Sequence, residues 1–368
     1  MPTAGLCPSD WRRSMAFELD KLVRPNIRDL LPYSSARLEY AGDAAIFLDA
    51  NENSCGSPVL NEYARYPDPL QRELKVALGE LIGVNSNGIF VGNGSDEAID
   101  LLIRAFCRPG IDNVIICPPT YGMYEVAAAL NDVFVRQVSL TSDLQLDIRA
   151  IRKSTDANTK LIFVCSPNNP TGNLMDSEAL LKLASDFDGI VVLDEAYIHF
   201  AGRGSMVRQL SELKNIVVLQ TFSKAWGLAG LRVGVALADA PIIDLLTRIK
   251  LPYNISGLTQ DTVMKALAMA PLVEENIARL IQERRRLADG LEKIPIVLNV
   301  YSSDANFLLC KFTDAQGVYQ HLLRDRIVVR DRSSLVMCDG CLRITVGTPE
   351  ETDELLRSLK NYEKSTFH

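Results

Sequence analysis

The chain has 368 residues, of which 47% are hydrophobic and 23% are charged, and these ordinary globular values exclude a chain that is disordered throughout. Its 39 Lys and Arg against 46 Asp and Glu give a net charge of −7. This balance argues against binding to nucleic acid or to an anionic membrane, because such binding needs clustered positive charge. At about 150 residues per domain, the length predicts two or three packed units.

The composition also argues against metal binding and against a secreted or membrane-bound protein. Three scattered histidines make a metal site built from histidine improbable, and no metal is expected. Residues 1–30 lack a secretory apolar stretch, and no run approaches the roughly 20 apolar residues of a membrane span. The eight cysteines are therefore expected to be reduced thiols of a cytoplasmic protein. The isolated CxxC motif of Cys338 and Cys341 is interpreted as a turn, since a zinc site would need a second pair.

In chain order, residues 1–14 are expected to be a disordered extension, and residues 15–60 an N-terminal arm joining the small domain. From residue 61 to 257, short apolar runs alternate with helical patterns. The predicted strands are Ile89–Val91, Val114–Cys117, Val133–Val138, Leu161–Cys165, Ile190–Leu193, Ile216–Leu219 and Val233–Ala238. The predicted helices between them are Leu70–Ile82, Asp96–Phe106, Tyr121–Leu130, Ser177–Phe187 and Pro241–Lys250. Strands without polar alternation are typical of a mostly parallel sheet that helices cover on both faces.

After Pro252 the pattern changes. A long charged helix is expected over residues 258–293, followed by alternating strands (Phe307–Lys311 and Leu342–Val346) and two short helices. We therefore predict an α/β protein with a large domain at 61–257 and a smaller α+β domain at 258–368. The arginine run at 284–286 is interpreted as a solvated helix face or a subunit contact.

Polar residues follow four of the predicted strands, at the sheet edge where open α/β sheets bind ligands. After the first strand, Gly-Asn-Gly-Ser95-Asp96 opens a helix, whose free N–H groups could bind a phosphate. The acidic residues there could equally be ordinary first-turn residues. The turn Ser-Pro-Asn-Asn169-Pro-Thr-Gly places Asn169 at the same edge, although it could be an ordinary strand-to-helix turn.

The other two strand ends carry stronger signals. Asp194 ends a fully apolar strand, where an unpaired carboxylate costs several kcal/mol. Lys224 follows another buried strand among small and apolar residues, which favours a lowered pKa and amine chemistry. The helix start at Ser95 and Arg232 would fit a phosphate, Asp194 a ring cation and Lys224 an aldehyde. We therefore expect one ligand that carries all three groups. Pyridoxal 5′-phosphate (PLP) carries all three.

At this point the chain resembles the fold-type I, class II aminotransferases, and within them the histidinol-phosphate aminotransferase family. The matching blocks, which extend over nearly the whole chain from Met15, are LDANEN (48–53), RYPD (65–68), GNGSDE (92–97), PPTYGMY (118–124), SPNNPTG (166–172), LDEAY (193–197), FSKAWGLAGLRVG (222–234) and CLRITVGT (341–348). The resemblance implies the fold-type I architecture, with a mostly parallel seven-stranded sheet between helices and a smaller α+β domain.

The resemblance also implies roles for the cofactor residues. Lys224 would be the catalytic residue, holding PLP covalently and moving the proton of the reaction. Asp194 would pair with the pyridine nitrogen, Tyr197 and Asn169 would bond the phenolic oxygen, and Tyr121 would stack on the ring. The cofactor phosphate would be met by Ser95, Asp96, Ser223 and Arg232 and by Tyr66 of the neighbouring subunit. A shared site of this kind would make the protein a homodimer.

For the substrates, the resemblance implies that Arg343 binds the carboxylate of glutamate or 2-oxoglutarate and the phosphate of histidinol phosphate, and that Arg330 helps to bind that phosphate. Asn53 and Tyr124 would line the entrance. From the sequence pattern alone, Arg330 would be interpreted as a surface residue that forms an ion pair with Asp331. The chain departs from the family after LDANEN, where residues 54–58 read Ser-Cys-Gly-Ser-Pro in a loop that shapes the substrate pocket.

The expected reaction is transamination between histidinol phosphate and 2-oxoglutarate in histidine biosynthesis. Two other activities remain open on the same fold, those of an aromatic-amino-acid aminotransferase and of an amino-acid O-phosphate decarboxylase. A cofactor-sensing regulator is unlikely, because such proteins carry a fused basic DNA-binding module and residues 1–14 are too short for one.

Overall fold

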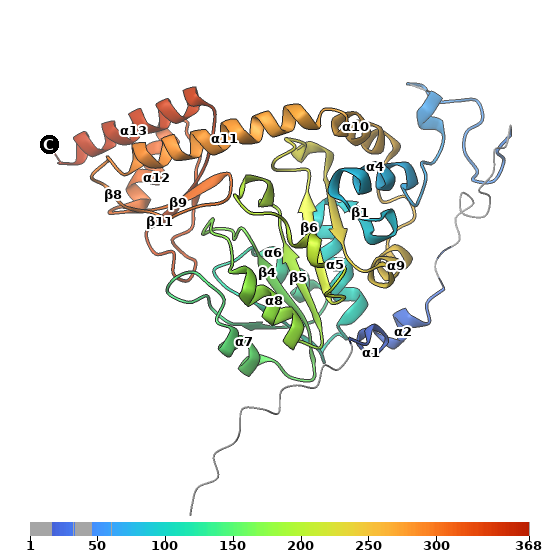
Figure 1. Cartoon of the computed structure of the whole chain (residues 1–368). Coiled ribbons are helices and arrows are strands. Elements are labelled where there is room, and N and C mark those ends of the chain that lie inside the picture. The colour runs from blue at the N-terminus through green and yellow to red at the C-terminus, as the bar shows by residue number, and fades with distance from the viewer. Residues whose placement is uncertain (1–16, 32, 34–45, 60, 368) are drawn as a thin grey trace, which may run out of the picture.

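The computed structural model describes residues 17–31, 33, 46–59 and 61–367, so the expected extension at residues 1–14 lies outside it. The described residues form a large α/β unit and a smaller α+β unit, joined by the long helix along the top of Figure 1. No helix in this part of the chain is both long and apolar enough to cross a bilayer.

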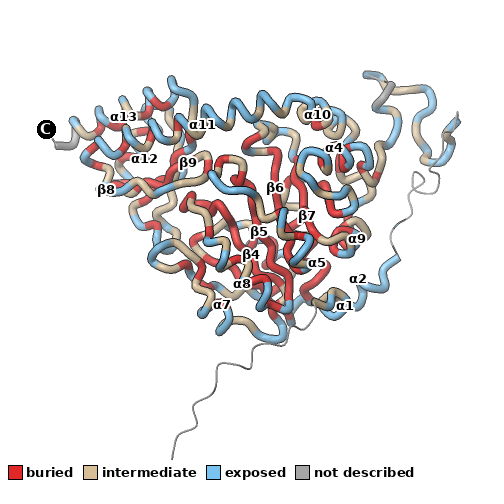
Figure 2. The backbone as a smooth tube through the Cα atoms, in the orientation of Figure 1, coloured by how far each residue is buried: buried red, intermediate tan, exposed pale blue. Residues whose placement is uncertain are grey.

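The larger sheet has the seven predicted strands. They are β1 (Ile89–Asn93), β2 (Asn113–Ile116), β3 (Phe134–Gln137), β4 (Thr159–Cys165), β5 (Ile190–Asp194), β6 (Ile216–Thr221) and β7 (Val233–Leu237). Their order is β1-β7-β6-β5-β4-β2-β3, and β7 runs antiparallel to both of its neighbours in a sheet that is otherwise parallel. Every residue of β5 and β6 is buried, which agrees with their unbroken apolar runs and places them at the centre of Figure 2.

Helices cover both faces of this sheet. Their bounds are α4 (Arg72–Ile82), α5 (Gly94–Phe106), α6 (Met123–Leu130), α7 (Ile148–Ser154), α8 (Ser177–Asp186) and α9 (Ala240–Ile249), and the short 3-10 helices are η1 (Asn61–Ala64), η2 (Ser86–Gly88), η3 (Ile198–Phe200), η4 (Met206–Gln209) and η5 (Ala229–Leu231). One apolar core contains side chains of α5, α6 and α9, and a second contains side chains of α4, α7 and α8. Helix α7 was not predicted, because its seven residues are too few to establish a helical period.

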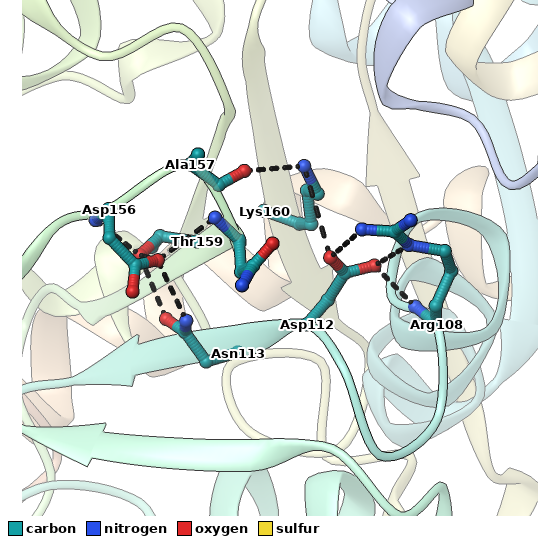
Figure 3. A network of polar contacts seen from close by, with 8 residues as sticks. Arg108, Asp112, Asn113, Asp156, Ala157, Thr159 and Lys160 are labelled. Carbon is teal, nitrogen blue, oxygen red and sulfur yellow. Dashed lines mark hydrogen bonds and ion pairs between the residues drawn. The ribbon is translucent and has the colours of Figure 1, made fainter.

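A polar network fixes the amino ends of β2 and β4, at the end of the sheet opposite to the predicted site (Figure 3). The buried carboxylate of Asp112 accepts hydrogen bonds from Nε and Nη2 of Arg108, both at 2.8 Å. Asn113 donates to Asp156 at 3.0 Å and accepts from the Thr159 hydroxyl at 2.8 Å. These bonds satisfy the buried polar groups between the two strand starts, where the β2–β4 register shifts between Asn113 and Val114.

The smaller unit is an antiparallel sheet with helices on one side. Its elements, with the two helices that lead to it, are α10 (Gly257–Leu267), α11 (Ala270–Leu291), β8 (Val297–Val300), β9 (Phe307–Phe312), α12 (Ala315–Arg324), β10 (Arg330–Asp331), β11 (Cys341–Thr345) and α13 (Pro349–Phe367). The strand order is β10-β11-β9-β8, and side chains of α11, α12 and α13 share one core with the sheet. The predicted boundary between residues 257 and 258 falls at the start of α10, and the division into two domains stays a prediction.

One expectation for this region is wrong. The single helix expected over residues 258–293 is broken between α10 and α11, because Pro271 has no N–H group to continue α10 and instead lies in the first turn of α11. In the arginine run, Arg285 and Arg286 are exposed, as expected for a solvated helix face, whereas Arg284 is half-buried. Arg284 donates to the carbonyl oxygens of Ala305 at 2.6 Å and Phe200 at 3.2 Å, so it ties α11 to both units.

The described helices of the N-terminal arm, α1 (Leu19–Leu22) and α2 (Pro25–Arg28), pack against the large unit. Val23, between them, is buried in the core that contains α5 and α9. The backbone N–H of Arg24 donates to Ala105 at 3.0 Å, and Arg248 of α9 donates to the Arg28 carbonyl at 3.0 Å. These helices therefore lie far from the small sheet, which the arm was expected to join (Figure 1).

Candidate active site

A cavity of about 160 Å³ lies at the carboxyl ends of β4, β5 and β6 and at the start of α5. Nine of the ten residues predicted to bind the cofactor line it, namely Ser95, Asp96, Tyr121, Asn169, Asp194, Tyr197, Ser223, Lys224 and Arg232. Polar residues at four strand ends therefore do converge, as expected for the edge of an open α/β sheet. None of the predicted site residues lines the larger cavity of about 400 Å³ behind Thr221.

The start of α5 forms one end of the cavity, and two glycines allow Arg232 to approach it. Gly94 has a φ of +72°, and a Cβ there would lie 2.8 Å from Nη2 of Arg232. A Cβ on Gly234 would lie only 2.2 Å from the backbone nitrogen of Ser95. Arg232 lies 3.4 Å from both the Ser223 hydroxyl and an Asp96 carboxylate oxygen. Because a helix start also presents unpaired N–H groups, this end of the cavity suits an anion.

Asp194 forms the floor of the cavity. Its carboxylate is only 3% exposed and accepts hydrogen bonds from the Tyr124 hydroxyl at 2.7 Å and from the Ala196 N–H at 3.1 Å. Burial raises its pKa from 3.8 to about 6, although these two bonds and the Lys224 charge act in the opposite direction. The carboxylate thus lacks a full counter-charge, and a cationic group of a ligand would supply one.

Lys224 lies in the loop after β6. The Thr221 hydroxyl accepts from the Ser223 N–H at 3.1 Å, and the Lys224 carbonyl accepts from the Gly227 N–H at 3.1 Å, so the loop is held on both sides of the lysine. Burial lowers the pKa of Lys224, and the nearby positive charge of Arg343 lowers it further. The neutral amine, which is the nucleophilic form, is favoured as a result.

The small sheet closes the cavity through Arg343 of β11. Its Nη1 donates to the side-chain oxygen of Asn169, and its guanidinium carbon lies 5.2 Å from the centre of the Phe307 ring. Tyr197 packs edge-on against the same ring, with 5.1 Å between the ring centres. The structure therefore brings Arg343 to the cofactor residues, where its free donors can bind a substrate anion.

Arg330 lies directly opposite Arg343 in the strand pairing and is exposed. The ion pair expected with Asp331 from the sequence alone is absent, since one carboxylate oxygen of Asp331 accepts from the Ser333 N–H at 2.8 Å and no ion pair joins Arg330 to any residue of the described chain. Arg330 is thus available to a ligand beside Arg343.

Five predicted site residues are not among those that line the cavity: Arg343 and Arg330, described above, and Tyr124, Asn53 and Tyr66. Tyr124, expected at the entrance, is fully buried, stacks on Phe163 at 4.9 Å and bonds Asp194, so its expected placement is wrong. Asn53 is exposed, and its side chain accepts from the Cys55 N–H at 3.0 Å. Tyr66 is 50% exposed and stacks on Tyr253, with 4.4 Å between ring centres. Neither Asn53 nor Tyr66 reaches the cavity of its own chain.

Sequence reasoning missed the support of Asp194 by Tyr124. The signal was the spacing of Tyr121 and Tyr124, since side chains three residues apart at a helix start can share a face. The two rings do meet, edge to face, with 5.5 Å between their centres. Of the remaining residues that line the cavity, Gly94 belongs to the predicted Gly-Asn-Gly stretch, whereas Cys165, Ala196, Thr221 and Ala229 are small and gave no signal of their own.

Comparison with known proteins agrees with this geometry. The family model for aminotransferase class I and II matches residues 58–359. The histidinol-phosphate aminotransferase of Cytophaga hutchinsonii is 51% identical over 348 residues, which are 95% of this chain and 100% of that protein. The chain belongs to the histidinol-phosphate aminotransferase family. This membership confirms the resemblance seen in the sequence.

Solved structures of histidinol-phosphate aminotransferases share the fold. The enzyme from Clostridium acetobutylicum is 26% identical with a TM-score of 0.76, over 83% of this chain and 92% of that one. The enzyme from Sinorhizobium meliloti, solved in complex with pyridoxal-5′-phosphate, is 23% identical with a TM-score of 0.77, over 93% and 97%. The aminotransferase fold predicted from the sequence is therefore confirmed.

The cavity residues also fit the cofactor of such enzymes. The anion site at the start of α5, the buried carboxylate of Asp194 and the amine of Lys224 match the phosphate, the ring nitrogen and the aldehyde of PLP. The strongest of these observations is Asp194, because a buried carboxylate with a raised pKa is costly unless a ligand brings a positive charge.

Proposed function

We propose that the protein is a histidinol-phosphate aminotransferase that uses PLP to convert L-histidinol phosphate and 2-oxoglutarate into 3-(imidazol-4-yl)-2-oxopropyl phosphate and L-glutamate, a step of histidine biosynthesis. The observation that carries this proposal is the meeting of Lys224, Asp194 and the anion site of α5 in one cavity that Arg343 closes. The proposal is supported by relatives named histidinol-phosphate aminotransferase that match this chain over nearly their whole length.

Each end of the cofactor would have its own residues. The N–H groups of Ser95 and Asp96, the Ser223 hydroxyl and Arg232 would bind the phosphate. Asp194 would accept a hydrogen bond from the ring nitrogen and keep a proton there. Asn169 and Tyr197 would donate to the phenolic oxygen, and Tyr121 would pack on the ring.

When bound, PLP supplies an electron sink for the negative charge that develops at the substrate Cα. Lys224 would first hold the cofactor through its amine, and once released it would move the proton from Cα. Burial and the charge of Arg343 favour its neutral form, which both tasks require. Asp194 would help to stabilise the negative charge that develops at Cα, because it would keep a proton on the ring nitrogen.

For the substrates, Arg343 would bind the carboxylate of glutamate through a bidentate contact. The same guanidinium, with Arg330 opposite it, would bind the phosphate of histidinol phosphate. The two half-reactions would thus use one site for anions of different size and charge, next to Asn169.

We further propose that the protein is a homodimer with shared active sites. Tyr66 is half exposed, is held by stacking on Tyr253 and by a bond from its N–H to Glu52 at 2.7 Å, and lies outside its own cavity. An aromatic hydroxyl presented in this way would reach the cofactor phosphate of a second copy, and Asn53 would reach that copy's substrate entrance. The free thiols of the cysteines in the described chain support a reducing, cytoplasmic location.

A donor panel tests the activity. The PLP-loaded protein is mixed, without an acceptor, with histidinol phosphate, phenylalanine or threonine phosphate, and the absorbance of the bound cofactor is followed. We expect histidinol phosphate to convert the cofactor to its amine form fastest. Faster conversion by phenylalanine would instead indicate an aromatic-amino-acid aminotransferase, and carbon dioxide release from threonine phosphate would indicate a decarboxylase. Either result would refute the proposed function.

A further inference from the structure

Arg332 lies on the same face of the small sheet as Arg330 and Arg343. Its N–H donates to the Cys341 carbonyl at 3.0 Å, which continues the β10–β11 pairing by one residue beyond Asp331. Side chains two residues apart on a strand point to the same side, and Arg330 is directly opposite Arg343. Three guanidinium groups are therefore presented together on the face that closes the active-site cavity.

None of these three arginines forms an ion pair with a carboxylate within the described part of the chain. The Nε atoms of Arg332 and Arg343 are buried without a hydrogen-bond partner. Burial lowers the pKa of Arg332, and the charges of Arg343 and Arg330 lower it further. A cluster of this kind is costly in the free protein and requires an anion to balance it.

Arg332 also lies within electrostatic range of the cavity itself. The phenol of Tyr197, which lines the cavity, interacts with Arg332 as well as with Arg343. An anion bound in the active site would therefore act on Arg332 as well as on Arg343.

We propose that Arg332 is a specificity-determining residue that binds the phosphate of the phosphorylated donor and not the carboxylate of glutamate. This inference rests on the proposed function. In histidinol phosphate, a CH₂–O group separates the phosphorus from Cα, whereas the carboxylate carbon of glutamate is bonded to Cα directly. The phosphate thus extends further across the small sheet, carries a charge of about −1.5 to −2 and offers three acceptor oxygens. Arg343, which contacts Asn169, serves both substrates, and Arg332 meets the longer and more highly charged group.

The test measures both half-reactions of the PLP-loaded protein by stopped-flow. In Arg332→Gln we expect kcat/KM for histidinol phosphate to fall about 10- to 100-fold, mainly through KM, because a hydrogen-bonded charge contact is lost. The value for glutamate should change less than about threefold. Arg332→Lys, which keeps the charge without the guanidinium fork, should restore part of the loss. Arg324→Gln, which removes an exposed arginine of α12 instead, is the matched control and should leave both donors unaffected.

A second readout does not depend on turnover of the phosphorylated donor. Inorganic phosphate should inhibit the glutamate half-reaction competitively, and Arg332→Gln should weaken this inhibition about tenfold or more. Equal losses for both donors, or unchanged phosphate inhibition, would overturn the role of Arg332. If the wild type does not react with histidinol phosphate at all, the proposed function fails instead, and the inhibition by phosphate still decides the role of Arg332.

Discussion

Replacement of Asp194 by Asn should stabilise the cofactor-free protein at neutral pH. The shift of its pKa from 3.8 to about 6 corresponds to about 3 kcal/mol, at 1.36 kcal/mol per pKa unit, by which the buried charge destabilises the fold. The amide of Asn can still accept from Tyr124, but its NH₂ group would face the Ala196 N–H, which costs about 1 kcal/mol. The expected net gain in unfolding free energy is about 2 kcal/mol at pH 7.5.

The pH dependence gives the sharper test. The folded-state pKa lies above the unfolded value, so the folded protein binds more protons between about pH 4 and 6, and the unfolding free energy falls as pH rises through this window. The gain from Asp194→Asn should therefore shrink below about 1 kcal/mol at pH 5. Urea unfolding of both apoproteins at the two pH values measures this difference. A variant that is less stable at pH 7.5, or a gain that is equal at both pH values, would refute the reasoning.

Two further predictions concern the anion site and the subunit contact. Gly234→Ala should lower the unfolding free energy by about 3 kcal/mol and weaken PLP binding, because its Cβ would meet Ser95 N at 2.2 Å. Gly230→Ala, whose Cβ meets nothing within 4 Å, is the control in urea unfolding and PLP titration. A mixed dimer of one Tyr66→Ala and one Lys224→Ala subunit should regain up to about half of the native dimer's activity, because one of its two shared sites regains both groups. No recovery would contradict the shared site.

The large sheet could be predicted because short apolar segments of the sequence are enough to show that its strands are buried. β4, β5 and β6 each contain a run of four or five apolar residues without polar alternation (LIFVC, IVVL and IVVL), which is typical of strands buried on both faces. Asp194 could be identified for the same reason, since it directly follows such a run and must lie at the end of a buried strand. Lys224 could be identified because it lies among small and apolar residues in the loop after the run of β6. The position of each group thus followed from its own segment of chain.

The residues that were misplaced or missed depend on contacts between distant segments. Tyr124 bonds a carboxylate 70 residues away, and its local spacing from Tyr121 indicates a shared face but not this partner. Arg332 shares a face with Arg343 only because β10 pairs with β11 in one particular register. The packing of α1 and α2 on the large unit likewise depends on Ala105 and Arg248, far along the chain.

The same groups that carry the chemistry oppose the stability of the free protein. Burial raises the pKa of Asp194 and lowers those of Lys224, Arg343 and Arg332, so in every case the fold disfavours the charged form. An ordinary core would place apolar residues at these positions. A ligand that supplies a cation to Asp194 and an anion to the arginines removes these costs only in the folded state, so part of its binding energy appears as stability of the fold. Binding selectivity and unfolding free energy should therefore respond together when any one of these charges is removed.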